Sequence, residues 1–330
     1  MSEKPTILVT GASGFLGLHL VRVLLDAGHS VRSLGRKANQ RLADLGVDQR
    51  VGSVTDPRDC AAALAGAGEV YHLAGAVSRE KDGGGPLYAV HIEGTRNILQ
   101  ASLDAGIEQV VVVSTSGTVG VGHESSFMAR ENTPVPWKII GKWPYYESKA
   151  LAEREVAYFV DKGLPVKMAR PTLLLGPGDY NGSSTGDVAK FLTGEVKAAL
   201  PGGMSMVDVR DVAAVLPALM EKGEPGVGYL LGAANFEVRD FLLGLEQVSG
   251  VRAPSFTLPR RLVDRAHGLF KAISGMSAFG GLEAQTFEMG CEYWYIDSSR
   301  AIDELDFAPR DWLDTLSDTV SDIRGIGVRR

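Results

Sequence analysis

A glycine-rich turn near the start of the chain limits the possible fold more than any other feature of the sequence. Gly11, Gly14 and Gly17 lie between a short β-branched segment and an apolar segment. Gly11 permits a tight turn, Gly14 lets backbone amides approach a ligand, and Gly17 lets the following helix pack closely on the strand. The first turn of that helix offers unpaired N–H groups and partial positive charge, which suit a pyrophosphate. This succession of strand, turn and helix favours a dinucleotide site over a turn that only connects two elements.

The first half of the chain alternates short β-branched segments with longer helical patterns. We expect strands at 7–9, 31–34, 69–73, 110–113 and 166–169, and helices at 15–27, 39–45, 86–105 and 145–161. This alternation is typical of βαβ units in a parallel sheet. The four valines at 110–113 lack polar alternation, so we expect a central strand covered on both faces. The predicted fold class is α/β, a doubly wound parallel sheet (Rossmann fold) with a smaller C-terminal lobe.

The pattern changes after about residue 171. Glycine and proline are frequent between 176 and 203, and helices are expected at 236–249, 258–274 and 311–323 without regular strands between them. We therefore assign residues 1–170 to a dinucleotide-binding domain and 171–330 mainly to a substrate-binding lobe. The segment 205–220 is a candidate to return to the first domain.

Composition excludes several other classes of protein. The 330 residues are 45% hydrophobic, enough for a large core, and 34 Lys and Arg oppose 40 Asp and Glu without a basic stripe, which argues against a nucleic-acid partner. Cys60 and Cys291 are too few for a disulfide framework or a metal cluster, and two buried thiols in a reducing cytoplasm are expected. Residues 6–10 are too short an apolar segment for a signal peptide, and nothing later reaches the ~20 apolar residues of a membrane span. A cytoplasmic protein with no membrane partner is therefore predicted.

The end of the second expected strand indicates which dinucleotide is bound. NAD enzymes place an acidic residue there to hold the ribose 2′-hydroxyl, and this chain has Gly35. Arg36 and Lys37 follow, and their charges suit a 2′-phosphate, Arg36 through its bidentate fork. These residues favour NADP, used as NADPH in reduction. The alternative is that both are solvated cations at the end of a strand.

A tyrosine and a lysine at the start of the helix expected at 145–161 are candidates for catalysis. Tyr145 and Lys149 are four residues apart, so they share one face of a helix and point into the same cleft. An ammonium group beside a phenol favours the phenolate, so we expect Lys149 to lower the pKa of Tyr145 from its ordinary value near ~10. Tyr145 can then donate a proton to a carbonyl or accept one from an alcohol. Tyr146 is the rival tyrosine, but Ala150 stands four residues after it.

The order of these motifs resembles the extended branch of the short-chain dehydrogenase/reductase superfamily, the NAD-dependent epimerase/dehydratase family. A Gly-x-x-Gly-x-x-Gly turn, a serine after the central strand and Tyr-x-x-x-Lys follow one another, and the resemblance covers residues 1–215. It implies that Ser116 binds the substrate oxygen, that Tyr145 is the general acid and base, and that Lys149 also contacts the nicotinamide ribose. It also implies a homodimer formed through helices 86–105 and 145–161.

The resemblance and the residues above together imply a set of cofactor contacts. They are Gly11, Ser13, Gly14, Phe15, Leu16, Gly17, Arg36, Lys37, Ser53, Val54, Ala74, Gly75, Ala76, Ser114, Pro171, Thr172 and Leu173. Two segments depart from the family pattern. Ser53 stands where the family usually has aspartate near the adenine, and His91 stands where it commonly has asparagine. The roles of both residues stay open, and a single hydrogen bond from His91 is expected before a catalytic role.

Two branches of the family fit as to substrate. Carbonyl reductases similar to dihydroflavonol reductases and hydroxysteroid dehydrogenases are favoured by Arg36 and by the segment 170–172. The loop before Tyr145 carries four large apolar residues that either wall an apolar cleft or simply pack the loop onto the body: Trp137, Ile139, Ile140 and Trp143. The expected reaction is NADP(H)-dependent reduction of a ketone, or oxidation of the matching alcohol.

The second branch contains nucleotide-sugar epimerases and dehydratases, including hopanoid-associated epimerases. Arg210 and Arg239 are candidates to meet a sugar-nucleotide pyrophosphate, or they are surface cations. A third reading is a non-catalytic dinucleotide-binding regulatory protein, which would lack one of the serine, tyrosine and lysine. All three are present, and the sequence leaves the substrate and the direction of reaction open.

Overall fold

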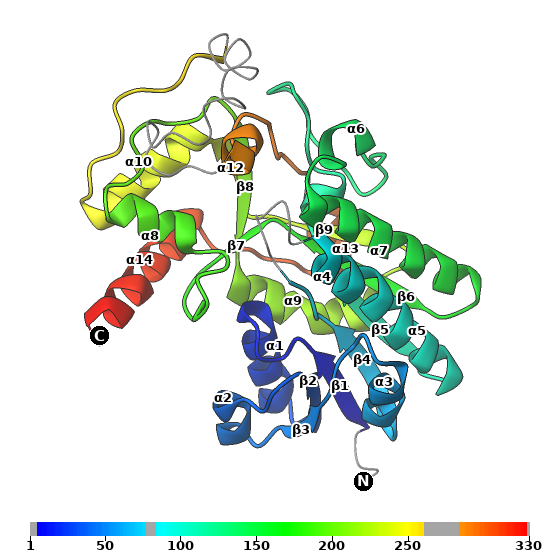
Figure 1. Cartoon of the computed structure of the whole chain (residues 1–330). Coiled ribbons are helices and arrows are strands. Elements are labelled where there is room, and N and C mark those ends of the chain that lie inside the picture. Colours follow the sequence, from blue (N-terminus) through cyan, green and yellow to red (C-terminus); the bar gives the residue numbers. More distant parts are fainter. Residues whose placement is uncertain (1–4, 77–83, 261–283, 329–330) are drawn as a thin grey trace.

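The computed structural model describes residues 5–76, 84–260 and 284–328. Figure 1 shows two halves: a large sheet with helices on both faces, and above it a small sheet with helices α8, α10, α12 and α14. The helix expected at 258–274 lies almost entirely outside the described residues.

Among the described residues, seven parallel strands form the large sheet in the order β3-β2-β1-β4-β5-β6-β9. They are β1 (Thr6–Thr10), β2 (Val31–Gly35), β3 (Asp48–Val51), β4 (Ala67–His72), β5 (Gln109–Val113), β6 (Val166–Pro171) and β9 (Gly228–Leu231). The predicted doubly wound α/β fold is confirmed. The strand order reverses between β1 and β4, and in such sheets ligands bind at the carboxyl ends of the strands at this switch point.

Helices cover both faces of the large sheet. On one face lie α1 (Phe15–Asp26), α9 (Val209–Lys222) and α13 (Ser299–Leu305), and on the other α3 (Pro57–Leu64), α5 (Gly94–Asp104) and α7 (Pro144–Asp161). Val111 packs into the first core, whereas Val110 and Val112 pack into the second. The run at 110–113 therefore forms a strand buried on both faces at its centre, as its lack of polar alternation predicts.

Local sequence signals explain where several helices begin. Asn39 caps α2 (Gln40–Asp44), and its side chain accepts hydrogen bonds from the N–H groups of Arg41 and Leu42. Pro57 and Pro144 occupy first positions of α3 and α7, where no backbone N–H donor is needed. Two short helical segments, Ser116–Thr118 and α6 (Trp137–Ile140), connect β5 to α7.

The stretch expected to be one helix at 86–105 is interrupted. It consists of α4 (Gly84–Tyr88), a π-helical turn (Ala89–Glu93) and α5. A π-helical turn inserts one extra residue into a helix and so redirects a side chain, and such turns are frequent at functional sites. His91 lies in the middle of it.

The small half also contains a sheet, of order β10-β8-β7. The strands of this sheet are β7 (Leu173–Leu175), β8 (Gly203–Asp208) and β10 (Ala234–Glu237). The helices of the small half are α8 (Gly186–Leu192), α10 (Val238–Ser249), α12 (Ala284–Met289) and α14 (Trp312–Val328). These three strands were not predicted from the sequence, whereas between α10 and α14, where no regular strand was expected, the described residues form none. β7 and β10 have three and four residues, too few periods of alternation for the sequence to reveal them.

The chain passes between the two halves more than once. After β8, helix α9 packs against α1, and β9 then pairs with β6 in the large sheet. The helix α13 returns later and packs against α9 and β9. Segments at 209–222, 228–231 and 299–305 therefore belong to the large half.

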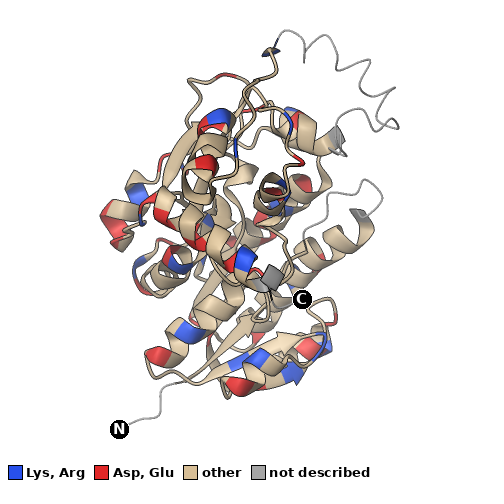
Figure 2. Ribbon diagram, turned by 90° about the vertical axis from the view of Figure 1, so that its left-hand side faces the viewer, with Lys and Arg blue, Asp and Glu red and all other residues tan. Residues whose placement is uncertain are grey.

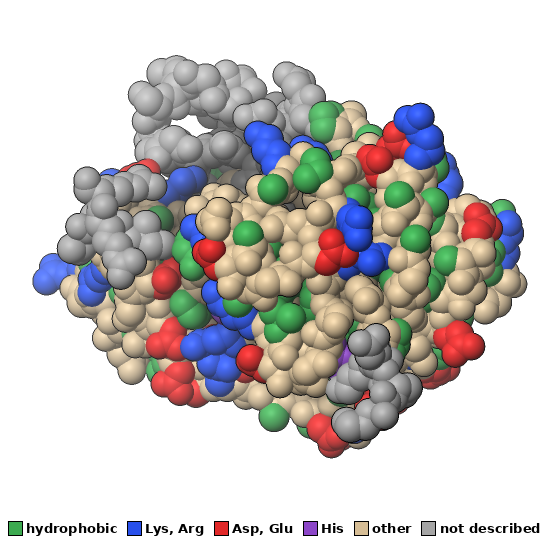
Figure 3. Space-filling model, turned by 90° about the horizontal axis from the view of Figure 1, so that it is seen from below, with side chains coloured by type: hydrophobic (Ala, Val, Ile, Leu, Met, Phe, Trp, Pro, Cys, Tyr) green, Lys and Arg blue, Asp and Glu red, His purple; other side chains and the backbone are tan. Residues whose placement is uncertain are grey.

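Charges of both signs are spread over the surface. Basic and acidic residues both occur along the helices in Figure 2, and side chains of both signs lie on the face in Figure 3. In the part of the chain that the structure describes, no helix is both long and apolar enough to cross a membrane.

Candidate active site

The glycine turn lies at the switch point between β1 and β4. Gly11 has φ +71°, and a Cβ atom there would lie 2.6 Å from the carbonyl carbon of Leu73. A Cβ atom on Gly17 would lie 2.2 Å from the carbonyl oxygen of Gly11. No side chain caps α1 and its first turn carries no acidic residue, so its N-terminal amides are available to an anion. This cradle fits the pyrophosphate of a dinucleotide.

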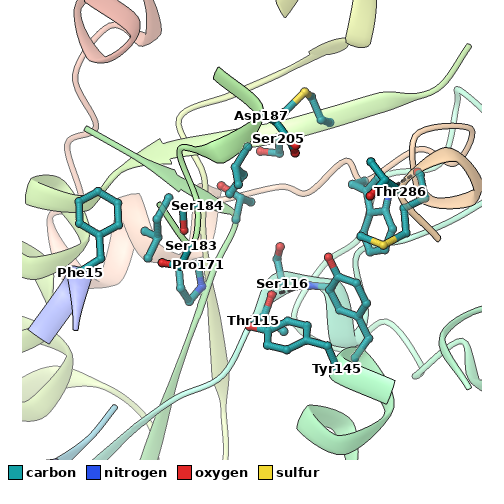
Figure 4. A pocket seen from close by; sticks show the side chains of 18 of the residues that line it. Phe15, Thr115, Ser116, Tyr145, Pro171, Ser183, Ser184, Asp187, Ser205 and Thr286 are labelled. Atoms are coloured by element: carbon teal, nitrogen blue, oxygen red, sulfur yellow. Dashed lines mark hydrogen bonds between the residues drawn. The ribbon is translucent and has the colours of Figure 1, made fainter. Parts of the chain in front are cut away.

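A cavity of about 650 Å³ runs from this turn into the small half. Figure 4 shows Phe15 at one side of it, and Ser116, Tyr145 and Thr286 at the other. Eleven predicted cofactor residues line it: Gly11, Gly14, Phe15, Leu16, Gly17, Gly75, Ala76, Ser114, Pro171, Thr172 and Leu173.

The three predicted catalytic residues line the same cavity. Ser116 starts the short helical turn after β5, and Thr115 caps that turn. Tyr145 and Lys149 lie in the first turns of α7, which packs against the turn of Ser116. Lys149 is 9% exposed, and its Nζ atom donates to the carbonyl oxygen of Val113 at 3.0 Å.

The electrostatics of this group differ from the expectation in one respect. Burial raises the pKa of Tyr145 to about 12, and burial lowers the pKa of Lys149 to about 8. The expected lowering of the Tyr145 pKa by Lys149 is therefore wrong for this arrangement. The cause is burial, which disfavours the charged phenolate. At neutral pH Tyr145 keeps its proton.

A buried ion pair lies next to the catalytic residues and holds the elements that carry them together. Glu153 on α7 binds Arg170 on β6 through two bonds of 2.7 and 3.0 Å, and both side chains are 9% exposed. Glu153 Oε1 also accepts from the hydroxyls of Ser114 at 2.6 Å and Thr118 at 2.9 Å. These bonds fix the end of β5 and the turn of Ser116 relative to α7.

Five predicted cofactor residues lie outside the large cavity and outside a second, smaller cavity beside the glycine turn. Arg36 and Lys37 are exposed directly after β2. The Ser53 hydroxyl bonds to Thr55, and its N–H donates to Asp59. The other two residues make contacts within the protein: the Val54 side chain is buried, and the backbone N–H of Ala74 donates to the Thr10 hydroxyl.

A second cavity of about 210 Å³ adjoins the glycine turn. It contains Ser13, the remaining predicted cofactor residue, and is also lined by Asn39, Arg41 and Tyr180. The guanidinium carbon of Arg41 lies 3.7 Å from the ring centroid of Tyr180, so α2 meets the loop after β7 here. Sequence reasoning missed both residues, because Arg41 reads as an ordinary helix cation and Tyr180 lies in a glycine-rich stretch.

The far end of the large cavity has an aromatic wall. The rings of Tyr146 and Trp294 lie 4.8 Å apart, and a Cβ atom on Gly117 would lie 2.1 Å from the Tyr146 ring. Both aromatic residues line the cavity. Tyr146 thus contributes to the wall, and sequence reasoning missed Trp294, for which the aromatic run at 293–295 was an available signal.

The apolar loop before Tyr145 packs behind this wall. Ile139, Ile140 and Trp143 are buried in one cluster that Trp137 packs against, and none of the four lines the cavity. The packing alternative is therefore the one that the structure shows. Arg210 and Arg239 do not line the cavity either: Arg210 pairs with Asp208 and Asp318, and Arg239 is exposed. This removes the two cations considered for a sugar-nucleotide pyrophosphate.

The sequence and the structure of this chain are similar to those of several known proteins. A family model, NAD dependent epimerase/dehydratase family, matches residues 7–232. Sterol demethylase protein B of Methylococcus capsulatus is 33% identical over 78% of this chain and 79% of its own length. A Synechocystis sp. protein named after dihydroflavonol 4-reductase is 30% identical over 94% of this chain and 92% of its own. Among solved structures, the crystal structure of gox2253 has a TM-score of 0.86 and 30% identity, covering 98% of this chain and 99% of that chain.

Proposed function

Because the chain belongs to the NAD dependent epimerase/dehydratase family, we propose that it is an NADP(H)-dependent oxidoreductase that reduces a ketone or oxidises the matching alcohol. The observation that carries this proposal is one cavity that joins three features. These are an uncapped helix N-terminus at the glycine turn, the group of Ser116, Tyr145 and Lys149, and an apolar far end.

The lining of the far end supports an apolar substrate. Most of its side chains are apolar, including Val188, Val196, Ala198, Leu200, Met204, Val238, Phe241, Leu242, Met289 and Trp294. At this end of the cavity, away from Lys149, the one lysine or arginine among the described lining residues is Lys190. A sugar-nucleotide pyrophosphate calls for more positive charge than one exposed lysine supplies. An alicyclic, aromatic or long-chain ketone suits this surface better.

The reaction follows from the placement of three side chains. A reduced dinucleotide, when bound, supplies the hydride. Tyr145, which is protonated at neutral pH, donates the proton of its Oη atom to the ketone oxygen. Ser116 donates a hydrogen bond from Oγ to the same oxygen and stabilises its developing negative charge. Once Tyr145 has lost its proton, the ammonium group of Lys149 stabilises the phenolate, and the buried setting excludes water.

Tyr145→Phe tests the catalytic assignment. We expect a loss of NADPH oxidation with a ketone panel of roughly 10²- to 10⁴-fold, the usual contribution of a positioned acid. NADPH affinity should stay within about twofold, because the ring and its packing are retained. Tyr158→Phe, at an exposed position of the same helix, is the matched control. Turnover equal to that of the unsubstituted enzyme would remove Tyr145 from the mechanism.

Arg36→Ala tests the preference for NADP. The proposal rests on Gly35, which leaves no carboxylate at the end of β2, and on the exposed cations Arg36 and Lys37 beside it. Loss of a charge-assisted bond to a 2′-phosphate should weaken NADPH about tenfold and NADH much less. Arg58→Ala, an exposed arginine on α3, is the control. Titrations that show both dinucleotides weakened alike would refute the assignment.

The same assays separate the two remaining readings. A nucleotide-sugar epimerase or dehydratase would convert nucleotide-sugars without net consumption of the dinucleotide. A regulatory protein would bind NADPH tightly and turn over neither class of substrate.

A cytoplasmic location is part of the proposal. It rests on the small number of cysteines: Cys60 and Cys291 are both buried, and two are too few for the disulfide framework of a small secreted protein. Cell fractionation with detection of the full-length chain tests it.

A further inference from the structure

His91 makes more contacts than a single structural hydrogen bond. It is 1% exposed, lines the large cavity and belongs to the π-helical turn between α4 and α5. Its Nε2 atom accepts from the backbone N–H of Ala76 at 3.1 Å. Its Nδ1 atom lies 2.8 Å from the hydroxyl of Ser148, which donates to the carbonyl oxygen of Tyr145 at 2.9 Å.

These contacts define the protonation state of the ring. A backbone N–H can only donate, so Nε2 carries no proton, and the single proton of the neutral ring is on Nδ1. The chain of bonds then runs in one direction, from His91 to Ser148 and from Ser148 to the carbonyl of Tyr145. A second proton on Nε2 would face the N–H of Ala76. Burial and the charge of Lys149 lower the pKa of His91 to about 2, which keeps the ring neutral.

The ring lies between two parts of the site. On one side is the loop 73–76 after β4, where a Cβ atom on Gly75 would lie 3.3 Å from His91 Nε2 and 3.5 Å from Lys149 Nζ. On the other side is the ring of Tyr145, edge-on at 5.7 Å between centroids. Ser148 itself is fully buried and does not line the cavity, so it acts on the site only through its neighbours.

We propose that His91 is a positioning residue that sets the loop 73–76 and the first turn of α7 at a fixed separation. It thereby couples the segment expected beside the dinucleotide to the tyrosine that transfers the proton. The role of Tyr145 in this statement rests on the proposed function. An asparagine at this position would have the reach of Nδ1 but not of Nε2, so histidine supplies the second contact.

Two substitutions of His91 test its contacts with Ser148 and Ala76 separately. An asparagine amide reaches about as far as Nδ1 of histidine, and a glutamine amide about as far as Nε2. His91→Asn therefore keeps the bond to Ser148 and loses Ala76. We expect about tenfold weaker NADPH binding, the effect of an unpaired buried N–H, with kcat within about twofold.

His91→Gln has the reverse effect. It keeps the bond to Ala76 and loses Ser148, so NADPH affinity should be retained while kcat falls about tenfold. Ser148→Ala should reproduce the His91→Gln result without touching the π-helical turn. His29→Asn, outside both cavities at the turn before β2, is the control and should leave both quantities unchanged.

Two readouts do not depend on ketone turnover. NADPH affinity is measured by fluorescence titration, and ionisation of Tyr145 by the ultraviolet absorbance of tyrosinate, each variant being compared with its Tyr145→Phe derivative. In His91→Gln and Ser148→Ala the Tyr145 titration should move to lower pH, because a loosened first turn admits water, whereas His91→Asn should not move it. If no ketone is reduced, the proposed function fails, and these two readouts still decide the role of His91. Equal effects of His91→Asn and His91→Gln on both readouts, or no effect of either, would overturn the inference.

Discussion

At the scale of single residues, Lys149 links the site to the stability of the fold. Burial lowers its pKa to about 8, below the 10.5 of an ordinary lysine. The folded protein therefore releases this proton at lower pH than the unfolded chain does. Below about pH 8 the fold bears the full cost of a buried ammonium group, and this cost diminishes as the pH rises.

The expected result is a pH-dependent difference from Lys149→Met. Between about pH 8 and 10 the free energy of unfolding of the unsubstituted protein should rise relative to that of the variant, by up to about 1.4 kcal/mol per pH unit. Urea unfolding at several pH values, without dinucleotide, measures it. Exposed Lys162 at the end of the same helix provides the control, Lys162→Met. A constant difference across this range would show that Lys149 is not desolvated in the folded state.

The residues that sequence reasoning placed in the cavity depend on local spacing. Tyr145 and Lys149 share a helix face, and the three glycines are defined by one turn, so neighbouring residues suffice to place them. Trp294 and Arg41 come from distant parts of the chain, and only the folded topology brings them to the site. The pKa of Tyr145 also required the structure, because it depends on how completely the ring is buried.

At the scale of elements, the carboxylate of Glu153 on α7 connects this helix to β5, to β6 and to the turn of Ser116. Glu153→Gln removes the charge that faces buried Arg170, so we expect a loss of about 3–5 kcal/mol in the free energy of unfolding. Turnover per folded molecule should fall as well, because Ser114 and Thr118 flank Ser116 and bond to Glu153.

A matched variant lies on the same helix. Glu155 pairs with half-exposed Arg96, and Glu155→Gln should cost at most about 1 kcal/mol and leave turnover unchanged. Denaturant unfolding and NADPH oxidation measure both variants. Equal destabilisation by the two substitutions would show that burial of the Glu153 pair does not set its importance.

The elements themselves were predictable where they are long and periodic. Helices α1 and α7 and the valine strand β5 lie within a residue of their expected bounds. The four-residue strands β9 and β10 escaped prediction because so short a segment carries little alternation. The π-helical turn left no sequence signal, since it changes the aim of His91 without changing the apolar pattern around it.

At the scale of the whole molecule, the homodimer stays a prediction. Helices α5 and α7 pack against each other, and Tyr158 on α7 is 51% exposed, a large apolar surface for a solvent-facing position. Tyr158→Arg should therefore convert the dimer to a monomer in light scattering. Leu243→Arg, at a similarly exposed position on α10, should not. A monomer before any substitution would rule the dimer out.

The position of β9 has a consequence for how the chain is made. It pairs with β6 at the edge of the large sheet, with Met168 opposite Gly228, although β7, α8, β8 and α9 lie between them in the chain. Until β9 emerges from the ribosome, the backbone N–H and C=O groups on this edge of β6 are unpaired and open to wrong pairing. A fragment ending near residue 170 would expose that edge permanently. The large sheet is therefore complete only after Leu231 has been synthesised.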